Sequence, residues 1–211
     1  PPIDSGYGAN RPYTPMERFF PHPGKGDANI HVLFPRGVDT PVPVVLFAPA
    51  LWKPSTMFYR DLLNHIVSRG NAVVFSTYNY HRLLNQKRRY RVLIEGFTAG
   101  LELIIDKIDT TQLTCIGHSY GGGAIPAVTW EFVVNRNWGQ SAASMFIMAP
   151  WYVHGIDEER MRSFPGQVKM VVQVYGGDRR MDRRIAEDIF YAIDIHPDEK
   201  DFIVIDDVES E

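Results

Sequence analysis

The chain has 211 residues, which is enough for one domain with a substantial core and too few for two comfortable ones. Its 45% hydrophobic and 22% charged residues exclude a disordered or fibrous chain. A net charge of −3 gives no basis for nucleic acid as a partner, and no apolar run reaches the roughly 18 residues of a membrane span.

Strand-like and helix-like segments alternate along most of the chain. Residues 1–27 are rich in Pro and Gly and are predicted to be an irregular lead-in, and residues 28–211 to be a single domain. In chain order, the predicted elements are strands at 28–35 and 43–49, a helix at 56–69, a strand at 72–78, a helix at 90–108, a strand at 113–117, a helix at 120–134, strands at 143–150 and 169–176, a helix around Ile185, Ile189 and Ile193, and a strand at 202–207. This alternation predicts an α/β domain with a mostly parallel sheet and helices on both faces.

A serine lies between two glycines after the 113–117 strand, in the segment Gly117-His118-Ser119-Tyr120-Gly121. A sharp strand–turn–helix of this kind presents a serine as a nucleophile, and such turns lie at the carboxyl ends of parallel strands, where chemistry gathers. The Tyr120 N–H, at the start of the following helix, is placed to stabilise an oxyanion. We therefore predict Ser119 to be catalytic rather than a chance match, and His118 to pack or to form a hydrogen bond rather than to act as the base.

The chain resembles α/β-hydrolases over about residues 28–207, in particular the branch of dienelactone hydrolases, chlorophyllases and cutinase-like polyester hydrolases. The resemblance rests on the segments VPVVLFAPALWKPSTMFYRDLLNHIVSRGNAVVF, GHSYGGGA and VVQVYGGD. It implies the α/β-hydrolase fold and a serine hydrolase of carboxylic esters. By position it implies that the Leu51 N–H completes the oxyanion hole, with the Trp52 N–H as the alternative, although Ala50 stands where the family has glycine.

The resemblance also implies a catalytic acid after the 169–176 strand. Asp178 stands directly at the strand end and is the preferred candidate, although an Asx-turn would also explain it. Asp182 is the second candidate, and a role as helix N-cap explains it equally well.

The family places its catalytic histidine after the last strand, where this chain has only Val208, Glu209, Ser210 and Glu211. Three interpretations stay open. The domain lacks a C-terminal loop that bears the histidine and a last helix, which is the preferred one. Alternatively, His154 or His81, which follow strands at the same end of the sheet, acts as the base. In the third, the site is degenerate and the protein binds ligands, or serves as a scaffold, without hydrolysing them.

The segment 151–168 is too short for an inserted lid domain, so we expect an open cleft that admits small or polymeric esters. Trp52 and Trp151 are predicted to line it as substrate-binding residues, with a place in the core as the alternative. The basic segment 79–91 either attracts anionic substrates or is a solvated loop. The chain has no spacing typical of a metal site or a phosphate-binding loop, so we expect no metal and no cofactor.

Overall fold

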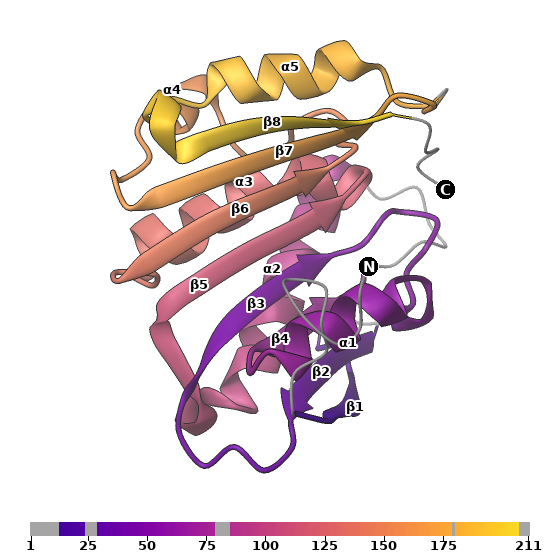
Figure 1. The fold of residues 1–211 in the computed structure, drawn as a ribbon, viewed down its shortest axis with the longest axis vertical. Coiled ribbons are helices and arrows are strands. Elements are labelled where there is room, and N and C mark those ends of the chain that lie inside the picture. The colour runs from indigo at the N-terminus through magenta and orange to yellow at the C-terminus, as the bar shows by residue number, and fades with distance from the viewer. Residues whose placement is uncertain (1–12, 24–28, 79–84, 179, 207–211) are drawn as a thin grey trace.

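The computed structural model describes residues 13–23, 29–78, 85–178 and 180–206. Its centre is an eight-stranded sheet with the strand order β1-β2-β4-β3-β5-β6-β7-β8 (Figure 1). The strands are β1 (Pro15–Pro21), β2 (Asn29–Pro35), β3 (Val42–Ala48), β4 (Ala72–Ser76), β5 (Ile108–His118), β6 (Ala142–Met148), β7 (Val168–Tyr175) and β8 (Lys200–Ile205). The β1–β2 and β2–β4 pairs are antiparallel, and all later neighbours are parallel.

Helices cover both faces of this sheet. They are η1 (Thr56–Tyr59), α1 (Arg60–Ser68), α2 (Gln86–Glu102), η2 (Ile105–Lys107), α3 (Tyr120–Trp130), η3 (Glu131–Asn135, a π-helical turn), α4 (Glu158–Met161), α5 (Arg183–Ala192) and η4 (Pro197–Glu199). On one face, Leu63 and Val67 of α1 are fully buried. On the other, Phe97 of α2, Val128 of α3 and Ile189 of α5 belong to one larger core cluster. The predicted α/β class with a mostly parallel sheet is confirmed.

The element boundaries differ from the prediction in two places around α2. This helix begins at Gln86, because the Asn85 side chain accepts a hydrogen bond from the Arg88 N–H at 2.9 Å and so caps it. It ends at Glu102 instead of reaching residue 108, and Ile108 pairs with Val42 as the first residue of β5. The apolar spacing that predicted one long helix thus runs across a helix and the start of a strand.

Residues 15–21 form β1, so the prediction that 1–27 is wholly irregular is wrong. This strand pairs with β2 along its whole length, from Pro15 opposite Pro35 to Pro21 opposite Asn29. Its prolines lie at its two ends on the edge of the sheet, where the missing N–H groups are tolerated. The segment PMERFFP is bounded by prolines and has no alternation of apolar and polar residues, so the sequence did not indicate a strand there. In the structure Phe19 of this strand is exposed.

Candidate active site

Ser119 joins β5 to α3 with φ 55° and ψ −118°. A non-glycine residue adopts a positive φ only where its surroundings impose it. Here the end of β6 does so: the Ser119 N–H donates to the Met148 carbonyl at 2.9 Å, and the Trp151 N–H donates to the Ser119 carbonyl at 2.8 Å. The serine is therefore held in a strained turn at the carboxyl end of the sheet, as the sequence predicts.

The glycines that flank this turn permit close approach of two chain segments. A Cβ on Gly121 would lie 2.1 Å from the Ala48 carbonyl oxygen, at the end of β3. A Cβ on Gly117 would lie 2.5 Å from the Gly121 oxygen. Neither glycine has a positive φ, since that conformation falls on Ser119 itself. The pattern of two glycines around a serine is thus explained by contacts rather than by backbone freedom.

Ser119 lies in a pocket of about 410 Å³. The residues that line it are Ala50, Leu51, Trp52, Lys53, Gln86, Arg89, His118, Ser119, Tyr120, Trp151, Arg180 and Met181. The structure thus brings five predicted site residues together, namely Ser119, Leu51, Tyr120, Trp52 and Trp151. Trp52 is 71% exposed and Trp151 is 41% exposed, so both lie at the pocket mouth and the alternative of a place in the core is wrong.

The loop opposite the serine is a tight turn from Ala50 to Lys53. The Lys53 N–H donates to the Ala50 carbonyl at 3.1 Å, which leaves Leu51 and Trp52 as the central residues of the turn. No described residue accepts a hydrogen bond from the Leu51 N–H or the Tyr120 N–H, and the latter belongs to the first turn of α3, where helical acceptors are missing. Both N–H groups belong to residues that line the pocket of Ser119.

Tyr59 links this loop to the serine turn. Its hydroxyl accepts a hydrogen bond from the Ala50 N–H at 2.9 Å and donates to His118 Nδ1 at 3.0 Å. Burial lowers the pKa of His118 to about 4, the Lys53 cation adds to the lowering, and Asp178 opposes it. His118 is therefore neutral at pH 7, and its Nδ1 accepts a hydrogen bond from the Tyr59 hydroxyl, which keeps its proton. This pair was not predicted, because nothing in the sequence relates residues 59 and 118.

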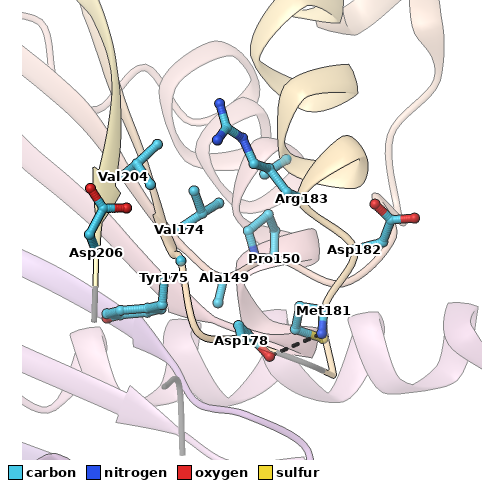
Figure 2. Close-up of a pocket in the computed structure, with 12 residues that line it drawn as sticks. Ala149, Pro150, Val174, Tyr175, Asp178, Met181, Asp182, Arg183, Val204 and Asp206 are labelled. Atoms are coloured by element: carbon cyan, nitrogen blue, oxygen red, sulfur yellow. Dashed lines mark hydrogen bonds between the residues drawn. The ribbon is translucent and has the colours of Figure 1, made fainter. Parts of the chain in front are cut away.

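A second pocket, of about 460 Å³, adjoins the first, and Met181 lines both. Asp178 lies here and not in the pocket of Ser119. Its Oδ1 accepts the N–H groups of Arg180 at 2.8 Å and Met181 at 3.1 Å, the second of which Figure 2 shows. Across the pocket, Asp206 lies at the end of β8 (Figure 2). Asp178 thus makes the turn that its strand-end position predicts and also faces a cavity beside the serine.

Asp182 lines the second pocket as well, on the side opposite Asp206 (Figure 2). It is the N-cap of α5, because its Oδ1 accepts the Arg184 N–H at 3.0 Å. The carboxylate also forms an ion pair with the exposed Arg184 guanidinium. The predicted capping role is confirmed, and these contacts account for Asp182 without a catalytic role.

The described histidines give no base in the family's position. His154 is 4% exposed, and its Nε2 lies 3.1 Å from the Tyr120 carbonyl oxygen behind the serine turn, away from the pocket lining. His196 precedes β8, at the end of the sheet opposite Ser119. His81, the other candidate, lies outside the described residues. Among the histidines that the structure describes, only His118 lines the pocket of Ser119.

Within the described ranges, no three His, Cys, Asp or Glu side chains form a group that could hold a metal ion. No helix in the same part of the chain is long and apolar enough to cross a membrane.

No protein-family model and no curated protein matches the sequence. Solved structures do match. The chain is 14% identical to carboxyl esterase 2 from Tuber melanosporum, with a TM-score of 0.69 over 93% of this chain and 76% of that one. It is 13% identical to a putative dienelactone hydrolase from Klebsiella pneumoniae, with a TM-score of 0.66 over 92% and 87%. For a bacterial brefeldin A esterase the values are 13%, 0.60, 95% and 70%. At these identities the likeness shows the fold, and the chain has the α/β-hydrolase fold.

Proposed function

We propose that this chain, which has the α/β-hydrolase fold, is a serine hydrolase of carboxylic esters that works through an acyl-enzyme on Ser119. The observation that carries the proposal is the strained Ser119 backbone, with φ 55°, at the end of β5 in a pocket that Leu51 and Tyr120 also line. Strained backbone conformations of this kind cost free energy and cluster at active sites, which supports a functional role for this serine. The esterases and hydrolases among the matching structures support the same reaction class.

The reaction follows from these positions. The Ser119 hydroxyl attacks the acyl carbon of the ester while a histidine takes its proton, and the Leu51 and Tyr120 N–H groups stabilise the oxyanion. Collapse of this intermediate expels the alcohol, which receives the proton from the histidine. Water then attacks the acyl-enzyme by the same route and frees the acid and the serine. Asp178 is assigned to orient the histidine and to stabilise its charged form.

The second pocket is the proposed place of that histidine. It is lined by Asp178 and by Asp206, the residue after β8, and it shares Met181 with the Ser119 pocket. None of the histidines that the structure describes lines it. The proposal therefore requires a histidine that the described residues do not supply, so the protein to test is the full-length product of the gene.

Substrates are proposed to enter from an open side. The connection from β6 to β7 is described throughout and holds only the four-residue α4, so an uncovered cleft fits small esters as well as polymeric ones. Trp52 and Trp151 at the pocket mouth offer aromatic faces to an apolar acyl or alcohol group.

A fluorophosphonate probe, which reacts with activated serines, tests the proposal. We expect labelling of the wild-type protein and none of Ser119→Ala. Ser163→Ala, which removes an exposed serine on the α4 side of the sheet, is the matched control and should label fully. Labelling that survives Ser119→Ala would contradict the assignment of the nucleophile.

The lack of a described histidine in the second pocket favours one alternative, a degenerate site that binds without hydrolysis. In that case the full-length protein reacts with no fluorophosphonate and hydrolyses no aryl ester, yet still binds ester-like ligands in the Ser119 pocket. Labelling at Ser119 excludes it.

A further inference from the structure

Three cationic side chains line the pocket of Ser119. Lys53 comes from the turn after β3, Arg89 from the first part of α2, and Arg180 from the loop after β7. No Asp or Glu is among the residues that line this pocket. Because the chain as a whole carries a net charge of −3, this gathering of positive charge does not reflect its overall composition.

These cations lack carboxylate partners within the described ranges, in contrast to many others of this chain. Six Arg and Lys side chains elsewhere form ion pairs: Arg136 with Glu131, Arg160 with Asp157, Arg162 with Glu158, Lys169 with Glu199, Arg183 with Glu187 and Arg184 with Asp182. No such ion pair among described residues involves Lys53, Arg89 or Arg180. Like charges that line one cavity repel one another, and an anion bound among them would offset that repulsion.

Arg89 is the best-placed of the three. Its guanidinium carbon lies 5.5 Å from the ring centroid of Tyr120, the residue after the serine, which fixes the side chain over the serine turn. Its Nε is buried and has no hydrogen-bond partner among the described residues. A buried guanidinium N–H without a partner loses stabilisation that a ligand oxygen can restore.

Lys53 lines the same pocket. It is half-buried in the turn that carries Leu51, and its charge helps burial to depress the pKa of His118, the neighbour of Ser119. Arg180 is exposed at the mouth. The carboxylate of Asp178 lines the adjoining pocket and accepts hydrogen bonds from the backbone N–H groups of Arg180 and Met181. The three cations are therefore not neutralised by a carboxylate among the residues that line this pocket, so the pocket would attract an anionic ligand.

We propose that the pocket of Ser119 contains an anion subsite formed by Lys53, Arg89 and Arg180, and that its substrates are esters which also carry a carboxylate or phosphate group. This inference rests on the proposed function for the word substrate, whereas the anion subsite itself does not require catalysis. A guanidinium matches the paired oxygens of a carboxylate or phosphate, and a lysine adds a point charge. The aromatic faces of Trp52 and Trp151 then hold the apolar part of the same molecule.

Binding of ligands that cannot be hydrolysed tests the subsite apart from catalysis. Calorimetric titration of the full-length protein would compare 3-phenylpropionate and benzylphosphonate with the neutral 3-phenylpropionamide. Since a hydrogen bond to a charged group contributes about 1.5–3 kcal/mol, we expect at least one anion to bind about ten-fold or more tightly than the amide. This preference should shrink as NaCl is raised. The tighter of the two anions shows whether the subsite takes a carboxylate or a phosphate.

Variants locate the effect. Arg89→Gln should weaken anion binding about ten-fold and change amide binding less than about twofold. Arg88→Gln is the matched control: it removes the same charge from the preceding, exposed position of α2 and lies outside the pocket lining, so both ligands should bind as in the wild type. If circular dichroism shows that Arg89→Gln does not fold, Lys53→Gln and Arg180→Gln take its place.

Equal binding of anions and amide by the wild type would overturn the subsite, and so would an equal loss in Arg88→Gln and Arg89→Gln. Its failure is distinguishable from failure of the proposed function. A protein that labels at Ser119 but shows no anion preference keeps the function and loses the subsite. A protein that prefers the anion but never labels keeps the subsite and loses the function.

Discussion

Tyr59 and His118 form a hydrogen bond of 3.0 Å across 59 residues of sequence, and through it the loop that carries Leu51 is joined to the turn that carries Ser119. The Ala50 N–H, at 2.9 Å from the same hydroxyl, completes the link. The relative position of a nucleophile and its oxyanion donors decides how well a developing charge is stabilised. Tyr59 is thus a positioning residue under the proposed function, since it acts through Ala50 and His118.

Tyr59→Phe removes both hydrogen bonds and leaves a buried N–H and a buried ring nitrogen without partners. We expect the free energy of unfolding to fall by about 1–3 kcal/mol in urea titration. Under the proposed function, kcat for an aryl ester should fall about ten-fold or more with little change in KM. Tyr90→Phe, which loses only a hydroxyl bond to the Ala127 carbonyl, is the control, and an equal loss of kcat there would contradict the positioning role.

The depressed pKa of His118 makes stability depend on pH in a stated direction. In the folded state this pKa is about 4 and in the unfolded chain 6.5, so between these values the unfolded state binds more protons. The free energy of unfolding should therefore decrease as pH falls from 6.5 to about 4, by at most about 3 kcal/mol from this group. His118→Asn keeps an acceptor for Tyr59 without titrating, so its stability profile should be flatter, whereas the exposed His196→Asn should follow the wild type. Identical slopes for wild type and His118→Asn would refute this.

Gly121 leaves no space for a side chain. The Cβ of alanine would lie 2.1 Å from the Ala48 oxygen and 2.5 Å from the Pro49 oxygen, both of them backbone atoms. Gly121→Ala is expected to lower the free energy of unfolding by about 3 kcal/mol or more, or to prevent folding. Gly166→Ala has no atom within 4 Å of the new Cβ and should stay within about 0.5 kcal/mol of the wild type. Thermal unfolding of the two variants tests the contrast.

Asp178 and Asp182, two of the three aspartates that line the second pocket, should respond differently to substitution. Under the proposed function, Asp178→Asn leaves the histidine without an anionic partner and should lower kcat about 10⁴-fold, as in the Ser-His-Asp template. Asp182→Asn keeps a good N-cap and loses only an exposed ion pair with Arg184, so kcat and stability should change little. A larger loss of kcat in Asp182→Asn would reverse the assignment.

The tryptophans at the pocket mouth should affect binding rather than folding. Trp52 is 71% exposed, so Trp52→Ala should leave the free energy of unfolding within about 0.5 kcal/mol of the wild type. The same variant should raise KM for an aryl ester several-fold, because an aromatic contact is worth about 1 kcal/mol. Trp130→Ala, which removes a packing contact with Phe164, should instead lower stability and leave KM unchanged. Unchanged KM in Trp52→Ala would contradict a substrate-binding role.

The sequence predicted those features that depend on local patterns. Apolar runs located the strands from 28–35 onward, and the serine between two glycines lies at a strained turn as expected. The features that it did not reveal depend on contacts between distant residues. Tyr59 and His118 meet only because β3 and β5 are neighbours in the sheet. The basic segment 79–91 pointed to Arg89, but Lys53 and Arg180 come from other loops, and Arg82 lies outside the described residues.

The hydrogen bonds of Ser119 also bear on how the protein is made. The serine conformation needs Met148 and Trp151 at the end of β6, while Gly121 needs the end of β3 beside it. Contacts between such distant parts of a chain form late, because the long intervening loops must first be closed. A chain still on the ribosome therefore has no formed serine turn until β6 has been synthesised. In a refolding reaction, the reactivity of Ser119 should therefore appear only when the sheet is complete. Helical circular dichroism from α3, which Ser119 precedes, can appear earlier.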